Sequence, residues 1–125
     1  MNSERARGLR LWLPVAACML FIFLVSCIPA KNIPDTGIPN FNKIFHLLEF
    51  IILGILLTRA FYHSYQCQCV NLIFIVILSI GIASLYAASD EWHQYFVPGR
   101  DCDFFDFVYD LVGSIVGVFL YTDTL

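Results

Sequence analysis

The sequence predicts an all-α fold, a four-helix transmembrane bundle. Hydrophobic residues make up 59% of the 125 residues and charged residues only 14%, whereas soluble domains contain about 25% charged residues. The apolar residues gather in four long runs, and roughly 20 helical residues are enough to cross a bilayer. Because hydrocarbon offers the backbone no hydrogen-bonding partner, such runs are expected to be helical. We therefore expect a single domain, residues 1–125, surrounded by the lipid bilayer.

The four expected helices differ in where they carry polar residues. They cover about residues 11–30, 44–61, 70–92 and 104–121. The first is uncharged and the third is uncharged through Ser89, whereas the second and fourth carry acidic residues near their N-terminal ends. Prolines and glycines interrupt helices, and they separate these runs at Pro29, Pro34, Gly37, Pro39, Pro98 and Gly99.

Basic residues predict the orientation of the bundle. Four flank the first and second spans on one side, Arg5, Arg7, Arg10 and Arg59, and three lie on the other side, Lys31, Lys43 and Arg100. Cytoplasmic flanks carry the excess of basic residues, so we expect both termini in the cytoplasm. The connections before the second and fourth helices then share the outer face.

Two features of the first 70 residues allow other interpretations, a cleaved lipoprotein signal in the first span and a metal clip after the second span. Residues 24–27 (LVSC) follow a basic start and an apolar run, as in a lipoprotein whose Cys27 is lipidated after cleavage. The apolar run exceeds the 7–15 residues of a secretory signal, and both interpretations stay open. His63, Cys67 and Cys69 lack the four-ligand spacing of a zinc site, so a polar connection is expected there.

The net charge of −3 and the scattered basic residues exclude a nucleic-acid-binding surface. The sequence does not predict an oligomeric state.

The fourth helix shows the clearest polar pattern. Asp106, Asp110, Gly113 and Gly117 are spaced by four, three and four residues, which places them within about 60° of one another on a helix. A charged side chain in a span costs roughly 2.5–3.5 kcal/mol, so it generally faces the bundle interior. This stripe predicts two inward carboxylates, with two glycines below them where another helix can approach closely.

The second and third helices carry matching polar ends. Lys43 and His46 share a stripe on the second helix with Glu49 beside it, and Asp90, Glu91 and Gln94 end the third. We expect these groups to meet those of the fourth helix in one site at the outer end of the bundle.

Acids outnumber bases in this expected site. Seven acids, Glu49, Asp90, Glu91, Asp101, Asp103, Asp106 and Asp110, accompany Lys43, Arg100, His46 and His93. Buried carboxylates in such excess need protons or a bound cation. Carboxylates suit a hard divalent ion, but no ligand-spacing motif is present, so the sequence predicts no metal and no cofactor.

Two segments carry a resemblance to a known family. Residues 42–46 (NKIFH) and 89–100 (SDEWHQYFVPGR) resemble the motifs of the VanZ-like family of small bacterial membrane proteins. In that family Asp-Lys-x-x-His opens the second helix, Asp-Glu-x-x-Gln-x-x-x-Pro-x-Arg ends the third, and an Asp on the fourth precedes an Asn and a Gly. The matching positions are Lys43, His46, Asp90, Glu91, Gln94, Pro98, Arg100, Asp106 and Gly113.

The resemblance covers about residues 11–121, and Ser26 with Pro29 matches the end of the family's first helix, which favours a retained helix. Asn42 stands where the family has Asp, and Asp110 where it has Asn. We expect these two residues to have exchanged roles across one contact.

The resemblance implies a multi-pass protein of the bacterial inner (cytoplasmic) membrane, in a family named for a protein that lowers susceptibility to the glycopeptide teicoplanin. No reaction is attached to the family motifs. Our main hypothesis is an outer-face pocket that recognises or modifies a lipid-linked or cell-wall-related ligand.

If the protein is an enzyme, Glu91 or Asp90 is the candidate general acid or base and His46 its proton partner. Lys43 and Arg100 would then neutralise an anionic group, and Asp106 would orient one of them. Gln94 and Asp110 complete the expected binding residues.

Two alternatives remain. In the first, the motifs are buried ion pairs, such as Arg100 with Asp106, in a structural or regulatory protein. In the second, Asp110 and Glu49 relay protons in a transporter, although the apolar run from Leu111 to Tyr121 argues against a pathway across a monomer.

Overall fold

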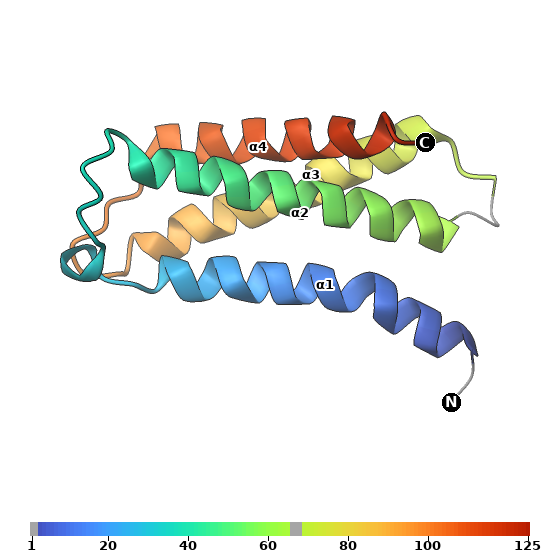
Figure 1. The fold of residues 1–125 in the computed structure, drawn as a ribbon, viewed down its shortest axis with the longest axis horizontal. Helices are drawn as coiled ribbons and strands as arrows, with labels where there is room; N and C mark the ends of the chain where they lie inside the picture. The colour runs from blue at the N-terminus through green and yellow to red at the C-terminus, as the bar shows by residue number, and fades with distance from the viewer. Residues whose placement is uncertain (1–2, 66–68) are drawn as a thin grey trace.

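The computed structural model describes residues 3–65 and 69–125, and this part of the chain is helical without strands. The helices are α1 (Ser3–Ser26), α2 (Phe41–Tyr65), α3 (Leu72–Gln94) and α4 (Phe104–Thr122), with a short 3₁₀ helix η1 (Ala30–Asn32) between α1 and α2 (Figure 1). All four α-helices are long and apolar enough to cross a membrane. The predicted all-α class and the four membrane-length helices are confirmed.

The helix boundaries differ most from the predicted ones at α1 and α2. α1 begins at Ser3, eight residues before the expected start, and α2 ends at Tyr65, four residues beyond the expected end. α1 ends at Ser26 rather than at Ala30, because Pro29 disfavours helical backbone at the residue before it. α2 begins at Phe41, three residues earlier than expected. Lys43 therefore lies in the first turn of α2, on the same rigid element as His46.

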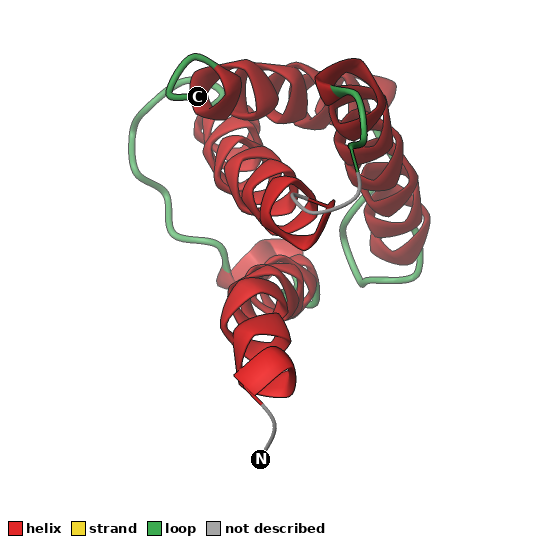
Figure 2. Cartoon of the chain, turned by 90° about the vertical axis from the view of Figure 1, so that its right-hand side faces the viewer, coloured by secondary structure: helices red, strands yellow, loops and turns green. Residues whose placement is uncertain are grey.

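The helices run alternately up and down (Figure 1). The α1–α2 and α3–α4 connections meet at one end of the bundle, which we call the loop end, and α1 begins and α4 ends at the opposite end, the terminal end. α1 bends in its N-terminal half (Figures 1 and 2). Pro14 lies within this helix, and a proline removes one helical hydrogen bond and permits such a bend. α1 keeps contact with α2 at the terminal end, where Arg7 donates to the His63 carbonyl at 3.1 Å and Trp12 donates to Ser64 Oγ at 3.3 Å.

α2 and α4 pack closely through glycines. A Cβ added to Gly113 would lie 2.5 Å from the carbonyl oxygen of Leu47, and one added to Gly54 would lie 2.5 Å from that of Ser114. Small residues let transmembrane helices approach to backbone contact. The glycine stripe expected on the fourth helix therefore does face a neighbouring helix, and that neighbour is α2.

The outward faces of the bundle are apolar. Large hydrophobic side chains such as Leu13, Ile73, Leu85 and Phe104 are 65%, 65%, 71% and 71% exposed. Exposed apolar surface on this scale is unusual for a soluble monomer and is normal for helices that face lipid.

Candidate functional site

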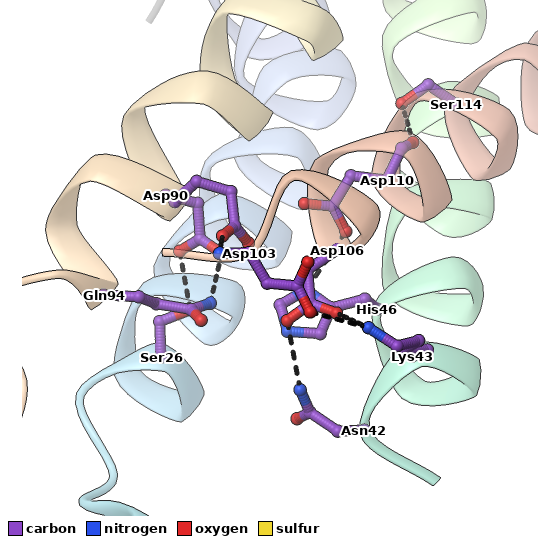
Figure 3. Close-up of polar contacts among 11 residues, drawn as sticks. Ser26, Asn42, Lys43, His46, Asp90, Gln94, Asp103, Asp106, Asp110 and Ser114 are labelled. Atoms are coloured by element: carbon purple, nitrogen blue, oxygen red, sulfur yellow. Dashed lines mark hydrogen bonds and ion pairs between the residues drawn. The ribbon is translucent and has the colours of Figure 1, made fainter. Parts of the chain in front are cut away.

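Buried polar side chains gather at the loop end, drawn in Figure 3. Eight of them come from all four helices: Ser26, His46, Glu49, Asp90, Glu91, Gln94, Asp106 and Asp110. The structure thus brings together six of the eight site residues expected from the sequence. Lys43 lies at the edge of this group and contacts Asp106. Arg100 lies outside the group, on the wall of a neighbouring cavity.

Lys43 connects the starts of α2 and α4. Its Nζ lies 2.9 Å from a carboxylate oxygen of Asp103 and 2.9 Å from one of Asp106. Asp103 also caps α4 by accepting a hydrogen bond from the backbone N–H of Phe105. The Lys43 ammonium, together with this backbone bond, holds the pKa of Asp103 below its usual value. Asn42 donates a longer hydrogen bond, 3.4 Å, to the other oxygen of Asp106.

His46 and Asp110 form a second α2–α4 contact deeper in the bundle. His46 Nδ1 lies 3.0 Å from Asp110 Oδ1, and both side chains are almost fully buried. The residues repeat the register of Lys43 and Asp106, one turn further along each helix. Two polar contacts therefore fix how α2 lies against α4 at this end.

Asp90 joins α3 to the end of α1. Ser26 Oγ donates to Asp90 Oδ1 at 2.6 Å, and Gln94 Nε2 donates to Asp90 Oδ2 at 3.0 Å (Figure 3). Gln94 also donates to Ser26 Oγ at 3.3 Å. Both oxygens of Asp90 thus have a hydrogen-bond donor while the side chain remains buried.

Glu91 and its neighbours carry unpaired buried oxygens. Glu91 Oε2 accepts the backbone N–H of Asp103 at 3.2 Å, but its other oxygen, one oxygen of Asp110 and one of Glu49 have no hydrogen-bond partner among the described residues. His46, Asp90, Glu91 and Asp110 each offer a nitrogen or oxygen atom within 4.8 Å of the others' atoms. The site therefore concentrates acceptors without enough donors.

A turn in the α3–α4 connection positions Arg100. The backbone N–H of Arg100 donates to the carbonyl of Val97, and Gly99 has φ of +75°. Proline followed by a positive-φ glycine is the pattern of a type II turn. Ala30 N–H then donates to the Pro98 carbonyl, which holds this turn against η1.

Arg100 lies on the wall of an apolar cavity of about 240 Å³ between the α1–α2 connection and the start of α2. The lining residues are Val25, Ile28, Ile33, Pro34, Phe41, Asn42, Phe45 and Arg100. Within the described part of the chain, the Arg100 guanidinium makes no hydrogen bond or ion pair, and Lys43 takes the place beside Asp106. The predicted Arg100–Asp106 pair is therefore wrong.

Three other expectations have structural outcomes. Asn42 contacts Asp106 rather than Asp110, so the expected exchange is not seen as a hydrogen bond between the described side chains. His93 lies against Phe23, 4.7 Å between ring centroids, instead of joining the acidic cluster. Of the suggested metal clip, Cys67 lies outside the described residues, and His63 hydrogen-bonds Tyr121 at the terminal end.

Two contributors lie outside the eight candidate site residues, although Asp103 was counted among the acids at this end and Ser26 matched the family resemblance. Ser26 is the last residue of α1, and a hydroxyl at the end of an apolar helix was the available signal. Asp103 precedes α4 as its N-cap, a position that acidic residues commonly occupy. Neither pattern could predict the partner on another helix, which is Asp90 for Ser26 and Lys43 for Asp103.

Comparison with known proteins gives a family. Residues 11–125 match the VanZ/LLP1 family. This range includes α1 from Leu11 onward, the whole of α2, α3 and α4, and the polar site. Searches of curated proteins and of solved structures find no match. The chain therefore belongs to the VanZ/LLP1 family, as a multi-pass membrane protein of four helices.

Proposed function

We propose that this protein binds an amphipathic anionic ligand at the loop end, namely a lipid-linked, cell-wall-related molecule. The observation that carries the proposal is the unpaired Arg100 guanidinium on the wall of an otherwise apolar cavity. An unpaired cation beside apolar walls suits a ligand that joins a phosphate or another anionic group to a hydrocarbon chain.

The size of the cavity fits part of such a ligand. Its volume of about 240 Å³ is below the 300–1,000 Å³ typical of pockets that enclose a whole small molecule. The cavity therefore holds the anionic group and the first part of the chain, while the rest of the chain lies in the bilayer. The basic residues Arg7, Arg10 and Arg59 lie together at the terminal end, which supports a cytoplasmic terminal end and an outer loop end.

Chemistry on the bound ligand would fall to the neighbouring acids. Glu91 or Asp90 is the proposed general acid or base, with His46 as its proton partner. Asn42 both lines the cavity and donates to Asp106, so the cavity and the acidic cluster share a wall.

A binding experiment tests the ligand class. The full chain in detergent is titrated with a polyprenyl phosphate and with the matching uncharged polyprenol, and binding is followed by native mass spectrometry. Removing a charge-assisted hydrogen bond costs about 1.5–3 kcal/mol, so Arg100→Gln should bind the phosphate roughly tenfold or more weakly. Lys31→Gln is the matched control, because Lys31 is an exposed cation of η1 at the same end of the bundle.

Equal binding of the polyprenyl phosphate and the polyprenol, or equal phosphate binding by Arg100→Gln and Lys31→Gln, would refute the proposal.

Membership of the VanZ/LLP1 family suggests a cellular test. Expression of the wild type in a teicoplanin-susceptible bacterium should lower susceptibility, and Arg100→Gln should lose this effect at equal protein abundance.

A second candidate function is structural, favoured by the bridge that Lys43 makes to Asp103 and Asp106. In this alternative the motifs lock α2 to α4 and bind nothing. Exchanging the charges, Lys43→Asp with Asp106→Lys in an Asp103→Asn background, would restore a purely structural pair. Recovered cellular activity in that variant would favour the structural role, and recovered stability without activity would favour the binding site.

A further inference from the structure

We propose that His46, Asp90, Glu91 and Asp110 form a binding site for a first-row divalent metal ion. One side chain comes from α2, two from the end of α3 and one from α4. The proposal does not rest on the ligand proposed for the cavity that Arg100 lines. Metal ligation by these side chains would replace the acid–base role proposed for His46, Asp90 and Glu91.

The geometry is close to that of a coordination sphere. In an octahedral site, as for Mn²⁺, metal–ligand bonds of about 2.1 Å place neighbouring ligand atoms roughly 3 Å apart and opposite ones roughly 4.2 Å apart. In a tetrahedral Zn²⁺ site all four ligand atoms lie roughly 3.4 Å apart, which requires a larger inward movement. The four candidate atoms all lie within 4.8 Å of one another. An inward movement of roughly half an ångström, within the range of side-chain rotation, would bring the widest pair to the separation of opposite ligands.

Unpaired oxygens supply a second, independent observation. Asp110 is 0% exposed and Glu91 is 4% exposed, yet Asp110 Oδ2 and Glu91 Oε1 have no hydrogen-bond partner in the described part of the chain. Buried polar atoms are almost always satisfied in folded proteins, and an exception indicates an ion or a water at that place. Glu49 adds another buried oxygen without a partner, and its charge interacts with those of His46, Asp90 and Asp110.

The charges point to the same conclusion. The site holds three carboxyl groups and one imidazole, and the Lys43 ammonium is bound to Asp103 and Asp106 outside this set. Asp90 keeps a free lone pair on each oxygen while Ser26 and Gln94 donate to it. Such donors to a carboxylate ligand are the usual outer partners of a metal site.

His46 fits in either of two ways. Nδ1 and Asp110 Oδ1 lie 3.0 Å apart, which is the spacing of two neighbouring ligands on one ion. Alternatively, Nε2 binds the ion while Asp110 orients the ring through Nδ1, the carboxylate–histidine–metal arrangement.

One nitrogen and three carboxylate oxygens suit Zn²⁺ or Mn²⁺. Ca²⁺ takes six to eight oxygen ligands, and soft ions such as Cu(I) prefer sulfur. The two favoured ions are distinguished by direct measurement.

The test uses the full chain purified in detergent, stripped with a chelator and reloaded with Zn²⁺ or Mn²⁺. Elemental mass spectrometry and calorimetric titration should give one ion per chain for the wild type. Co²⁺ substitution should produce visible d–d absorption that reports nitrogen and oxygen ligands.

Glu91→Gln keeps the size of the side chain and its acceptor for Asp103 N–H, and it should weaken metal binding at least tenfold. Asp110→Asn should do the same. Asp103→Asn is the matched control, because this acid lies at the same end outside the cluster, and it should bind metal as the wild type does. Circular dichroism identifies any variant that fails to fold, and Glu91→Asp then replaces Glu91→Gln.

Failure of the wild type to retain one ion per chain, or unchanged affinity in folded Glu91→Gln, would overturn the proposal and leave protons as the balancing charge. Arg100→Gln separates the two proposals, because it should retain the metal while losing the polyprenyl phosphate.

Discussion

Replacing Gly113 with alanine tests the close contact between α2 and α4. The new Cβ would lie 2.5 Å from the Leu47 carbonyl oxygen and 3.2 Å from Phe50 Cβ. Carbon–oxygen contacts in proteins begin near 3.3 Å, so the helices must separate locally by roughly 0.8 Å. Overpacking of this kind costs about 1–3 kcal/mol.

Gly81→Ala is the matched control on α3, because a Cβ there would meet nothing within 4 Å. Alanine also favours helix over glycine by about 1 kcal/mol, but this gain is common to both variants and cancels in their difference. Gly113→Ala should therefore unfold with about 1–3 kcal/mol less stability than Gly81→Ala.

The measurement is unfolding of the full chain in mixed micelles by titration with sodium dodecyl sulfate, followed by circular dichroism and tryptophan fluorescence. Because Asp110 lies one turn before Gly113, separation of α2 and α4 should also lengthen the 3.0 Å contact between His46 and Asp110. Equal unfolding free energies for the two variants would show that α4 does not rest on the backbone of α2.

Three further predictions concern the polar contacts. Lys43→Met should raise the pKa of Asp103 toward its ordinary value of 3.8, as measured by ¹³C NMR. Because the native pKa is depressed, the stability from this pair is present above pH 3.8 and is lost as the pH falls through the native pKa. The wild type should therefore lose its stability advantage over Lys43→Met in acid. Asp106→Asn should destabilise the fold more than Asp103→Asn in the same detergent titration, since Asp106 is buried beside Lys43 and Asp103 is 41% exposed. Ser26→Ala should cost about 1.5–3 kcal/mol by removing a buried donor to a carboxylate, and equal stability of Ser26→Ala and the wild type would contradict the assigned Ser26–Asp90 bond.

Helical periodicity accounts for what the sequence could predict. The spacing of Asp106, Asp110 and Gly113 placed these residues on one face of α4 before any helix was positioned, and that face does meet α2. Composition alone established the membrane helices. Both kinds of prediction depend only on residues within one helix.

Contacts between elements were less predictable. Lys43 and Arg100 were both candidate partners of Asp106, and the structure places Lys43 beside Asp106 and Arg100, after a type II turn, on the wall of the apolar cavity. Helical periodicity and topology placed His46, Asp90, Glu91 and Asp110 at one end of the bundle, but they could not show that the four side chains come within 4.8 Å of one another, since His46 and Asp110 are 64 residues apart. A ligand-spacing motif exists only where ligands share a local segment.

The hydrogen bond from Asp103 N–H to Glu91 fastens the two ends of the segment that bears Arg100. Binding of a metal ion or a proton by the Glu91 carboxylate would change the strength of this hydrogen bond. The segment would then shift the Arg100 guanidinium without any movement of a helix. Metal binding by the acidic cluster and anion binding at Arg100 would then be coupled through the Asp103 peptide group, so that occupancy of one site changes the affinity of the other.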